Sequence, residues 1–355
     1  MHLSDALLSP AVAITMDVAS VAVAGLSIFR MKKEDRINVD LSKQRIPTMA
    51  VMSALVFAGQ MINYTIAGTG SSGHICGGVM LAALLGPWGA FLSMIAVLLI
   101  QCLFFADGGL MALGTNVWNM AFYSCIAGYF LIYRPIMQSK IKNGRVKIIL
   151  ASILGSVLML QLGAFSVVLE SQISGVTDIP FGAFAALMQP IHLLIGLVEG
   201  LITAAVLLFV HESRPELLKE YAAPTKSAKM KFGSVILTLA IVVAVVGGGL
   251  SLFASSNPDG LEWSLFGNAE SGYSENLSLD EEDYGLSSIT SEKAAEIQDK
   301  LSFLPDYAFA GNPDSPVGTS VSGIVGSAIV AVVAVGLCAM GSVIRKKTVG
   351  NAQAK

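Results

Sequence analysis

Eight apolar runs, each long enough to cross a lipid bilayer, dominate this 355-residue chain. They occupy residues 10–29, 46–67, 87–106, 110–133, 146–169, 181–210, 232–254 and 321–344. A bilayer core is about 30 Å thick, and an α-helix needs about 20 residues to cross it. Helices satisfy their own backbone hydrogen bonds in lipid, so runs of this length predict an all-α polytopic membrane protein. The composition agrees, with 54% hydrophobic and 13% charged residues.

A shorter apolar run at residues 75–86 lies between the second and third of these runs. At about 1.5 Å per residue, its twelve residues reach about 18 Å if they are helical, which is less than the bilayer core. The segment that feeds it, residues 68–74 (GTGSSGH), must then dip into the protein. With this run counted as a crossing, we expect about nine transmembrane helical segments.

The basic residues are concentrated in segments that a nine-segment topology places on one face. Residues 30–45, 134–147, 214–231 and the tail from 345 hold 20 of the 22 Lys and Arg residues. Because basic loops stay on the cytoplasmic side, we expect the N-terminus outside and the C-terminus in the cytoplasm, in a multi-pass protein of the cytoplasmic membrane. His74 and the acidic segment 255–320, with 13 Asp and Glu against two Lys, then also lie outside.

The N-terminal segment is expected to fold back into the bundle. No Lys or Arg precedes the first apolar run, which is long enough to span, so a retained helix is favoured over a cleaved signal peptide. Ser9 and Pro10 are typical of a helix start, which leaves residues 1–8 outside the first span. Three of these eight residues are leucines, which favours their burial. We expect the initiator methionine to be retained, because His2 is a large second residue.

Met1 and His2 together can form a metal chelate that requires a chain terminus. The terminal amine, the deprotonated amide nitrogen of His2 and its imidazole Nδ1 would close fused five- and six-membered rings around one divalent ion. A fourth nitrogen would complete a square plane. Four nitrogens in a plane suit Ni(II), Cu(II) and low-spin Co(II), whereas Zn(II), Ca(II) and Mg(II) prefer tetrahedral or oxygen-rich ligand sets.

Several short motifs follow one another along the chain. They are MHLSDALLSP at 1–10, GHICGG at 73–78, LGPWGAFL at 85–92, QCLFFADGG at 101–109, ALGTN at 112–116, HLLIG at 192–196 and EGLIT at 199–203. In this order and spacing they resemble the CbiM/NikM family, the substrate-capture (S) components of cobalt and nickel energy-coupling-factor (ECF) transporters, over roughly the first 211 residues. Residues 232–344 resemble the two-span companion subunit CbiN/NikN, whose signature is PDGLE at 258–262.

The resemblance implies uptake of Ni(II) or Co(II) through a planar site made by Met1, His2 and His74. The ion is the transported ligand, and no prosthetic group or catalytic residue is expected. Ala6 stands where the family often has glycine, and the loop before His74 is slightly longer than usual, so the choice between nickel and cobalt stays open. Cys76 is expected to pack rather than to bind the ion.

Three parts are expected along the chain. A metal-capture transmembrane domain of about seven helices occupies residues 1–211, and a cytoplasmic linker follows at 212–231. A CbiN/NikN-like two-span domain occupies 232–355, with its acidic extracellular loop at 255–320. Within that loop, residues 291–301 are expected to form one short amphipathic helix.

The resemblance also implies partner proteins. The sequence contains no GxxxxGK[ST] phosphate-binding loop, so the energy for inward release must come from elsewhere. A transmembrane coupling (T) subunit and cytoplasmic ATPase subunits on separate chains would supply it, and this chain is not expected to be an enzyme or to bind nucleic acid.

A secondary ion-coupled metal transporter is an alternative function, although paired repeats with broken helices are not evident. An intramembrane hydrolase is a further alternative, but no Ser or Cys motif accompanies His192.

Several polar residues fall inside the expected spans. His192 and Glu199 are seven residues apart, which places them about 20° apart on one helix face. Ionisable groups in a membrane are candidates for a transport pathway or for coupling, and the alternative is a polar contact that locks helices together. Neither is expected to be a metal ligand. The amide side chains expected to bridge helices or to support the metal ligands are Gln60, Asn63, Gln101, Asn116 and Asn119.

Overall fold

The computed structural model describes residues 1–352 except 38, 176–179, 221–228, 269–272, 275–287, 310 and 313–314, and it describes the backbone alone for 35–43, 273–274 and 338–352. The long helices are α1 (Pro10–Ile37), α2 (Val39–Gln60), α3 (Gly78–Phe105), α6 (Gly144–Ser174), α7 (Phe181–Ser213), α8 (Phe232–Gly248) and α11 (Pro316–Ala352). The short helices are α4 (Leu113–Asn116), α5 (Arg134–Met137), α9 (Gly260–Phe266) and α10 (Ile289–Leu301). Two small hairpins are formed by β1 (Tyr64–Ile66) with β2 (Ser71–Gly73) and by β3 (Gly267–Asn268) with β4 (Tyr273–Ser274).

Seven helical segments in the described part of the chain are long and apolar enough to cross a membrane. They are Pro10–Glu34, Gly78–Phe105, Leu113–Met137, Gly144–Ser174, Phe181–Ser213, Phe232–Phe253 and Pro316–Leu337. The prediction of an all-α polytopic membrane protein is therefore confirmed. The segment Leu113–Met137 consists of α4, two π-helical stretches and α5. The count of nine crossings and the assignment of the two membrane sides stay predictions.

The predicted short run 75–86 and the predicted span 87–106 form two arms of α3. The helix breaks at Gly86, whose φ of 75° lies in the left-handed region that favours glycine. Pro87 follows, and it has no N–H to continue the helical hydrogen bonding. The first arm begins at Gly78 rather than at residue 75, because the backbone of Gly77 is also left-handed. Residues 74–77 thus remain an irregular loop, in which Cys76 is 3% exposed.

The predicted span 46–67 is too long at its C-terminal end. Helix α2 ends at Gln60, and the following residues turn into the β1–β2 hairpin, in which Tyr64 pairs with Gly73 and Ile66 with Ser71. The turn uses the left-handed conformations of two glycines, Gly68 and Gly70. Hydropathy counted Ile66 and its neighbours as membrane helix, because burial against protein and burial in lipid require the same apolar side chains.

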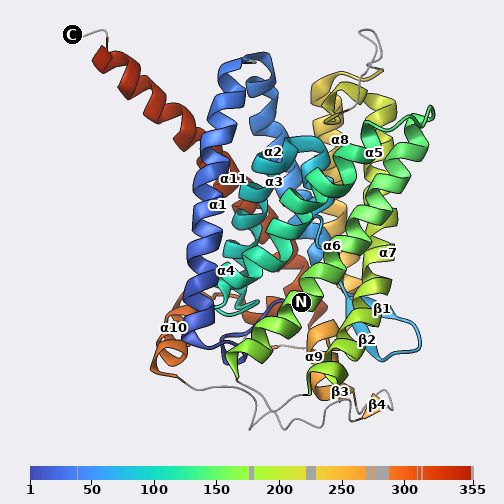
Figure 1. Ribbon diagram of the computed structural model, residues 1–355, viewed down its shortest axis with the longest axis vertical. Coiled ribbons are helices and arrows are strands. Elements are labelled where there is room, and N and C mark those ends of the chain that lie inside the picture. Colours follow the sequence, from blue (N-terminus) through green and yellow to red (C-terminus); the bar gives the residue numbers. More distant parts are fainter. Residues whose placement is uncertain are drawn as a thin grey trace.

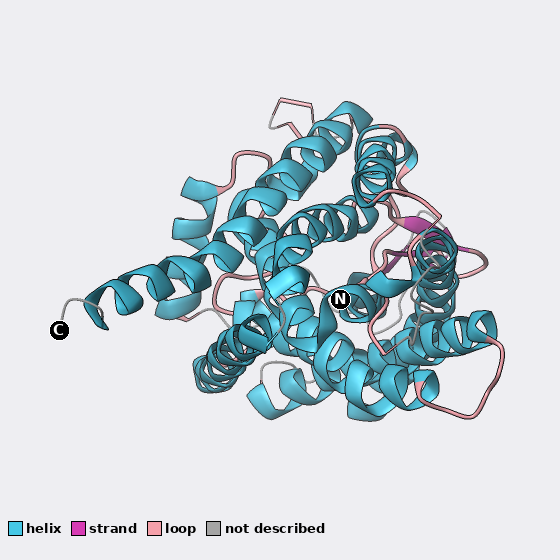
Figure 2. Ribbon diagram, turned by 90° about the horizontal axis from the view of Figure 1, so that it is seen from above, coloured by secondary structure: helices cyan, strands magenta, loops and turns pink. Residues whose placement is uncertain are grey.

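The long helices run roughly parallel, and the segments that connect them lie at the two ends of the bundle (Figure 1). The C-terminus and the connections α1–α2 and α5–α6 lie at one end. The β1–β2 hairpin, α9 and α10 lie at the other. Helix α10 covers the predicted short helix 291–301 and begins two residues earlier, while 269–272, 275–287, 310 and 313–314 of the acidic loop lie outside the described residues. Viewed down the bundle, the N-terminus lies among the helices rather than at the rim (Figure 2).

The two helices of the C-terminal part, α8 and α11, pack against α2 and against each other. Two glycines face each other across this contact. A Cβ placed on Gly323 of α11 would lie 2.2 Å from the carbonyl oxygen of Gly247 on α8. Small residues let membrane helices approach this closely and gain dispersion energy along their length.

We expect Gly323→Ala to separate α8 from α11 and to lower the free energy of unfolding by about 1–3 kcal/mol, the usual cost of overpacking. Gly336→Ala on the same helix is the matched control, because nothing lies within 4 Å of its added methyl group. Thermal unfolding in detergent measures both variants. Equal melting temperatures for the two would contradict the close packing.

Candidate metal centre

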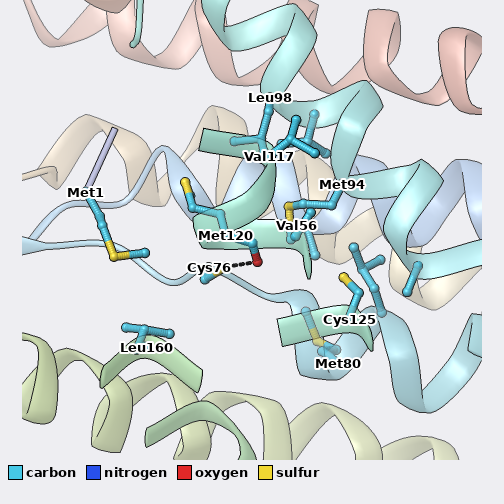
Figure 3. Packing of buried hydrophobic residues seen from close by; sticks show 14 of the residues in the cluster. Met1, Val56, Cys76, Met80, Met94, Leu98, Val117, Met120, Cys125 and Leu160 are labelled. Carbon is cyan, nitrogen blue, oxygen red and sulfur yellow. Dashed lines mark hydrogen bonds between the residues drawn. The ribbon is translucent and has the colours of Figure 1, made fainter. Parts of the chain in front are cut away.

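The structure buries five of the first eight residues, including the three leucines as predicted, and leaves the other three half-buried. Met1 is 6% exposed, and Leu3 and Leu7 are fully buried. The Met1 side chain lies among Cys76, Met120 and Leu160 (Figure 3). A chain terminus in this position brings its amine into the interior of the bundle.

Both backbone groups of Leu3, its N–H and its carbonyl, form hydrogen bonds with residues 109–116. Asn116 Oδ1 accepts a hydrogen bond from the Leu3 N–H at 2.8 Å, and Asn116 Nδ2 donates to the Leu3 carbonyl at 3.0 Å. The N–H of Gly109 donates to the same carbonyl at 2.9 Å. Asp5 Oδ1 accepts from the N–H of Ala112 at 2.8 Å. These bonds fix the terminal segment against residues 109–116, so that Met1 and His2 have a defined position.

The structure brings the three predicted ligand residues together. The imidazole rings of His2 and His74 are stacked, with centroids 5.4 Å apart and planes inclined by 21°. The Met1 amine forms an ion pair with Asp259 Oδ2 at 2.5 Å. A cavity of about 570 Å³ is lined by His2, His74 and Asp259, and a cavity of about 10 Å³, roughly the space of one water, is lined by Met1, His74 and Asp259.

Both imidazoles are neutral at neutral pH. Burial, followed by the positive charge of the Met1 amine, lowers the pKa of His2 to about 3 and that of His74 to about 4. His74 Nδ1 lies 3.1 Å from the carbonyl oxygen of Ile75. A carbonyl can only accept, so Nδ1 carries the proton and Nε2 keeps a lone pair that can bind an ion.

Two carboxylates that the sequence did not single out contact the predicted ligand nitrogens. Besides Asp259 at the amine, Asp107 Oδ1 lies 3.0 Å from His2 Nδ1, and the Tyr307 hydroxyl donates to the other oxygen of Asp107. Burial raises the pKa of Asp107. For Asp259, burial acts in the same direction, but the charge and hydrogen bond of the Met1 amine outweigh it and lower the pKa. An ion bound at these nitrogens would have to displace both carboxylates.

Asp259 reaches the amine from the PDGLE turn. Its Oδ1 accepts hydrogen bonds from the N–H groups of Leu261 and Glu262, at 2.7 and 2.9 Å, and so caps the start of α9. The turn is fastened to strand β2, because the Ser72 N–H donates to the carbonyl of Pro258 at 2.8 Å and the Ser72 hydroxyl donates to that of Asn257 at 2.7 Å. The C-terminal part thus contributes a charged group to the centre.

Glu199 holds the loop that carries His74. It is fully buried on α7, where Oε2 accepts from the N–H of Cys76 at 2.6 Å and Oε1 from that of Gly77 at 3.1 Å. Helix α3 begins at the next residue, Gly78, so the carboxylate satisfies N–H groups at a helix start and complements the helix dipole. Burial raises the pKa of the Cys76 thiol to about 12, and its Sγ donates to the Met120 carbonyl, which supports packing rather than ligation (Figure 3).

His192 lies on the same face of α7 as Glu199, but its neighbours differ from those of Glu199. Its Nδ1 donates to the carbonyl of Met188 at 2.8 Å, and its ring lies so close to Gly260 that an added Cβ there would be 3.0 Å from Cε1. It also lines the 10 Å³ cavity with Met1 and His74. Its predicted role in a pathway or in coupling stays a prediction.

The five predicted amide side chains have the following contacts. Asn116 bonds to Leu3, Asn119 bonds to Glu170 at 2.6 Å, Gln60 and Gln101 bond to each other, and Asn63 lines the larger cavity.

Among the described residues, no group of three His, Cys, Asp or Glu side chains is arranged to hold a metal ion. The predicted ligand set instead combines main-chain nitrogens of Met1 and His2 with the two imidazoles. Nitrogen donors in this number favour late transition metals over Mg(II) and Ca(II).

Two family descriptions match the sequence: "CbiM: Cobalt uptake substrate-specific transmembrane region" over residues 2–217, and "PDGLE domain" over residues 233–342. A putative fused nickel transport protein NikMN of Archaeoglobus fulgidus is 35% identical over 332 residues, which is 93% of this chain and 95% of that protein. A cobalt transport protein CbiM of Sorangium cellulosum is 31% identical over 172 residues, 48% of this chain and 76% of that protein. The crystal structure of a truncated transition metal transporter matches with a TM-score of 0.50 and 32% identity, covering 60% of this chain and 99% of that one.

We expect Asn116→Ala to loosen the terminal segment, because it removes two hydrogen bonds to Leu3 that are worth about 1 kcal/mol each. The Met1 amine should then react with an amine-specific reagent roughly tenfold faster or more at neutral pH, as followed by mass spectrometry of the N-terminal peptide. Asn143→Ala, which removes the cap of α6, is the control. An unchanged labelling rate in Asn116→Ala would argue against this anchor.

Glu199→Ala should lower the free energy of unfolding by about 2–4 kcal/mol, because two buried N–H groups at the start of α3 lose their acceptor. Glu212→Ala on the same helix removes an exposed carboxylate paired with Arg145 and should change stability by less than about 1 kcal/mol. Thermal unfolding in detergent compares the two variants. Similar losses in both would show that the contacts of Glu199 matter little.

Proposed function

Because this chain belongs to the CbiM family (cobalt uptake substrate-specific transmembrane region) and also carries a PDGLE domain, we propose that it captures Ni(II) or Co(II) as the substrate-binding subunit of an ECF-type transporter. It is a membrane protein of cobalt and nickel transport. The finer assignment rests on the centre at the N-terminus. The observation that carries it is the buried Met1 amine beside two neutral, stacked imidazoles.

The proposed ligands are four nitrogens. They are the Met1 amine, the amide nitrogen and Nδ1 of His2, and Nε2 of His74. The hydrogen bonds on Leu3 hold the first chelate in place, and Glu199 and the Ile75 carbonyl hold His74. Binding would displace Asp259 from the amine and Asp107 from Nδ1, and it would exchange protons for the ion. Selection against Mg(II) and Ca(II) follows from the type of ligand.

Transport requires partners that we assign to separate chains. A transmembrane coupling subunit and cytoplasmic ATPases would drive inward release, in which several metal–nitrogen bonds must break. The chain would lie in the cytoplasmic membrane with its N-terminus outside, since the basic connections share one end of the bundle (Figure 1). We assign residues 1–211 to capture and 232–355 to the PDGLE part. Uptake that depends on ATP in a reconstituted complex would separate this mechanism from an ion-coupled secondary transporter.

One extra residue placed ahead of Met1 should weaken Ni(II) binding at least about a hundredfold, more than the loss of a typical outer partner of a metal ligand. Every side chain remains in this variant, but the amine no longer closes a five-membered ring with the His2 amide. Isothermal titration calorimetry with Ni(II), Co(II), Cu(II) and Zn(II) on purified protein measures the effect, after intact mass has established the N-terminus.

The control for this experiment is the same extra residue at the C-terminus. His2→Ala and His74→Ala should each weaken binding as well, because each removes nitrogen ligands. Unchanged affinity in the N-terminally extended protein would refute the terminal chelate, whatever the histidine variants show.

A further inference from the structure

A chain of buried amides links the His74 loop to the His2 ring. Gln60 on α2 is 3% exposed and Gln101 on α3 is 1% exposed. Gln60 Nε2 donates to the carbonyl of Cys76 at 2.8 Å, and Gln101 Nε2 donates to Gln60 Oε1 at 2.7 Å. The Gln101 side chain in turn lies within hydrogen-bond reach of the imidazole of His2. The two amide side chains thus connect the loop that carries His74 with the surroundings of the His2 ring.

The orientation of each amide follows from the chain of bonds. The Cys76 carbonyl can only accept, so Gln60 must turn its NH₂ group to Cys76 and its oxygen to Gln101. Gln101 must then use its NH₂ group toward Gln60, which leaves its Oε1 for another donor. In the described structure, Gln101 Oε1 and His2 Nε2 are both buried and have no hydrogen-bond partner.

Gln101 Oε1 and His2 Nε2 belong to side chains that are neighbours in space. Gln101 Oε1 is always an acceptor, and His2 Nε2 is also one in the tautomer that carries its proton on Nδ1. A neutral imidazole carries one N–H, and when Nδ1 donates it to Asp107 at 3.0 Å, Nε2 presents a lone pair. A buried polar atom without a hydrogen-bond partner is unfavourable, because it has lost its bonds to water. If the proton moves to Nε2, Gln101 Oε1 gains a donor, but Nδ1 gives up its bond to Asp107 and turns a lone pair toward that carboxylate. A metal ion on Nδ1 enforces that move, since it takes the lone pair of Nδ1.

We propose that Gln101, held in register by Gln60, is a positioning residue that accepts the Nε2–H of His2 when Nδ1 binds the metal ion. This inference rests on the proposed function. It assigns the two glutamines to the metal-loaded state, in which the ring is fixed between the ion and an amide oxygen. Hydrogen bonds of this kind set the tautomer and the orientation of metal-binding histidines. The metal-free protein leaves the same acceptor without a donor.

Gln101→Met is the variant that tests the inference, because it keeps the length of the side chain and removes the acceptor. We expect Ni(II) affinity to fall 10–100-fold by calorimetry, the range for loss of such a partner. Gln60→Met should give a smaller loss, because Gln101 remains but is free to turn. Gln161→Met is the matched control, since the Gln161 amide donates to the carbonyl of Gln189 between α6 and α7 and not to a predicted ligand residue.

A spectroscopic measurement distinguishes positioning from general stability. Square-planar Ni(II) is diamagnetic, and the chain has four histidines, so ¹⁵N-labelled imidazoles can be followed by NMR in the Ni(II)-loaded protein. We expect the ring proton of His2 to lie on Nε2 and to be protected from exchange with water. In Gln101→Met the same proton should exchange faster. The unsubstituted protein alone gives this readout if a variant fails to fold.

Two results would overturn the inference. One is a proton on Nδ1 of His2 in the Ni(II)-loaded protein, and the other is parental affinity and exchange in Gln101→Met. If His74→Ala and the N-terminal extension still lose binding in that case, the proposed function stands without the role of Gln101. If neither loses binding, the proposed metal site itself is wrong.

Discussion

The ion pair between the Met1 amine and Asp259 joins the two parts of the chain at the candidate centre of the metal-free protein. A charged amine in a membrane bundle is costly unless an opposite charge compensates it. Met1 is 6% exposed, and its carboxylate partner is 258 residues away in the sequence. The hydrogen bonds on Leu3 and the capped start of α9 bring these distant groups together. Folding of the first residues is therefore coupled to the position of the PDGLE turn.

Local sequence predicted the helices well and their ends less well. The apolar run 146–169 lies within α6, because length and hydropathy alone decide whether a helix can cross a bilayer. The β1–β2 hairpin and the break at Gly86 depend on backbone conformations of single glycines, which hydropathy does not register. Met1, His2 and His74 were predicted as ligands from nitrogen chemistry and motif order, and the structure places them close together. Asp107 and Asp259 were missed as their partners, because a pairing between distant segments leaves no local signal.

Helical spacing identified a face of α7 but not what it contacts. His192 and Glu199 share that face, yet one lies against Gly260 of the PDGLE turn and the other holds the peptide groups after His74. Side-chain type could not separate these roles, since both are ionisable groups in an apolar helix. The buried amides raise the same difficulty. Only the direction of each hydrogen bond shows that Gln60 and Gln101 form one ordered series.

The presence of both parts in one polypeptide has a consequence for assembly. Asp259 meets the Met1 amine by an intramolecular encounter, so its effective concentration there is set by chain connectivity and not by how densely the membrane is populated. A separately encoded partner would have to find the same surface by lateral diffusion and would dissociate on dilution. The covalent arrangement fixes a one-to-one ratio of the two parts from the moment of synthesis.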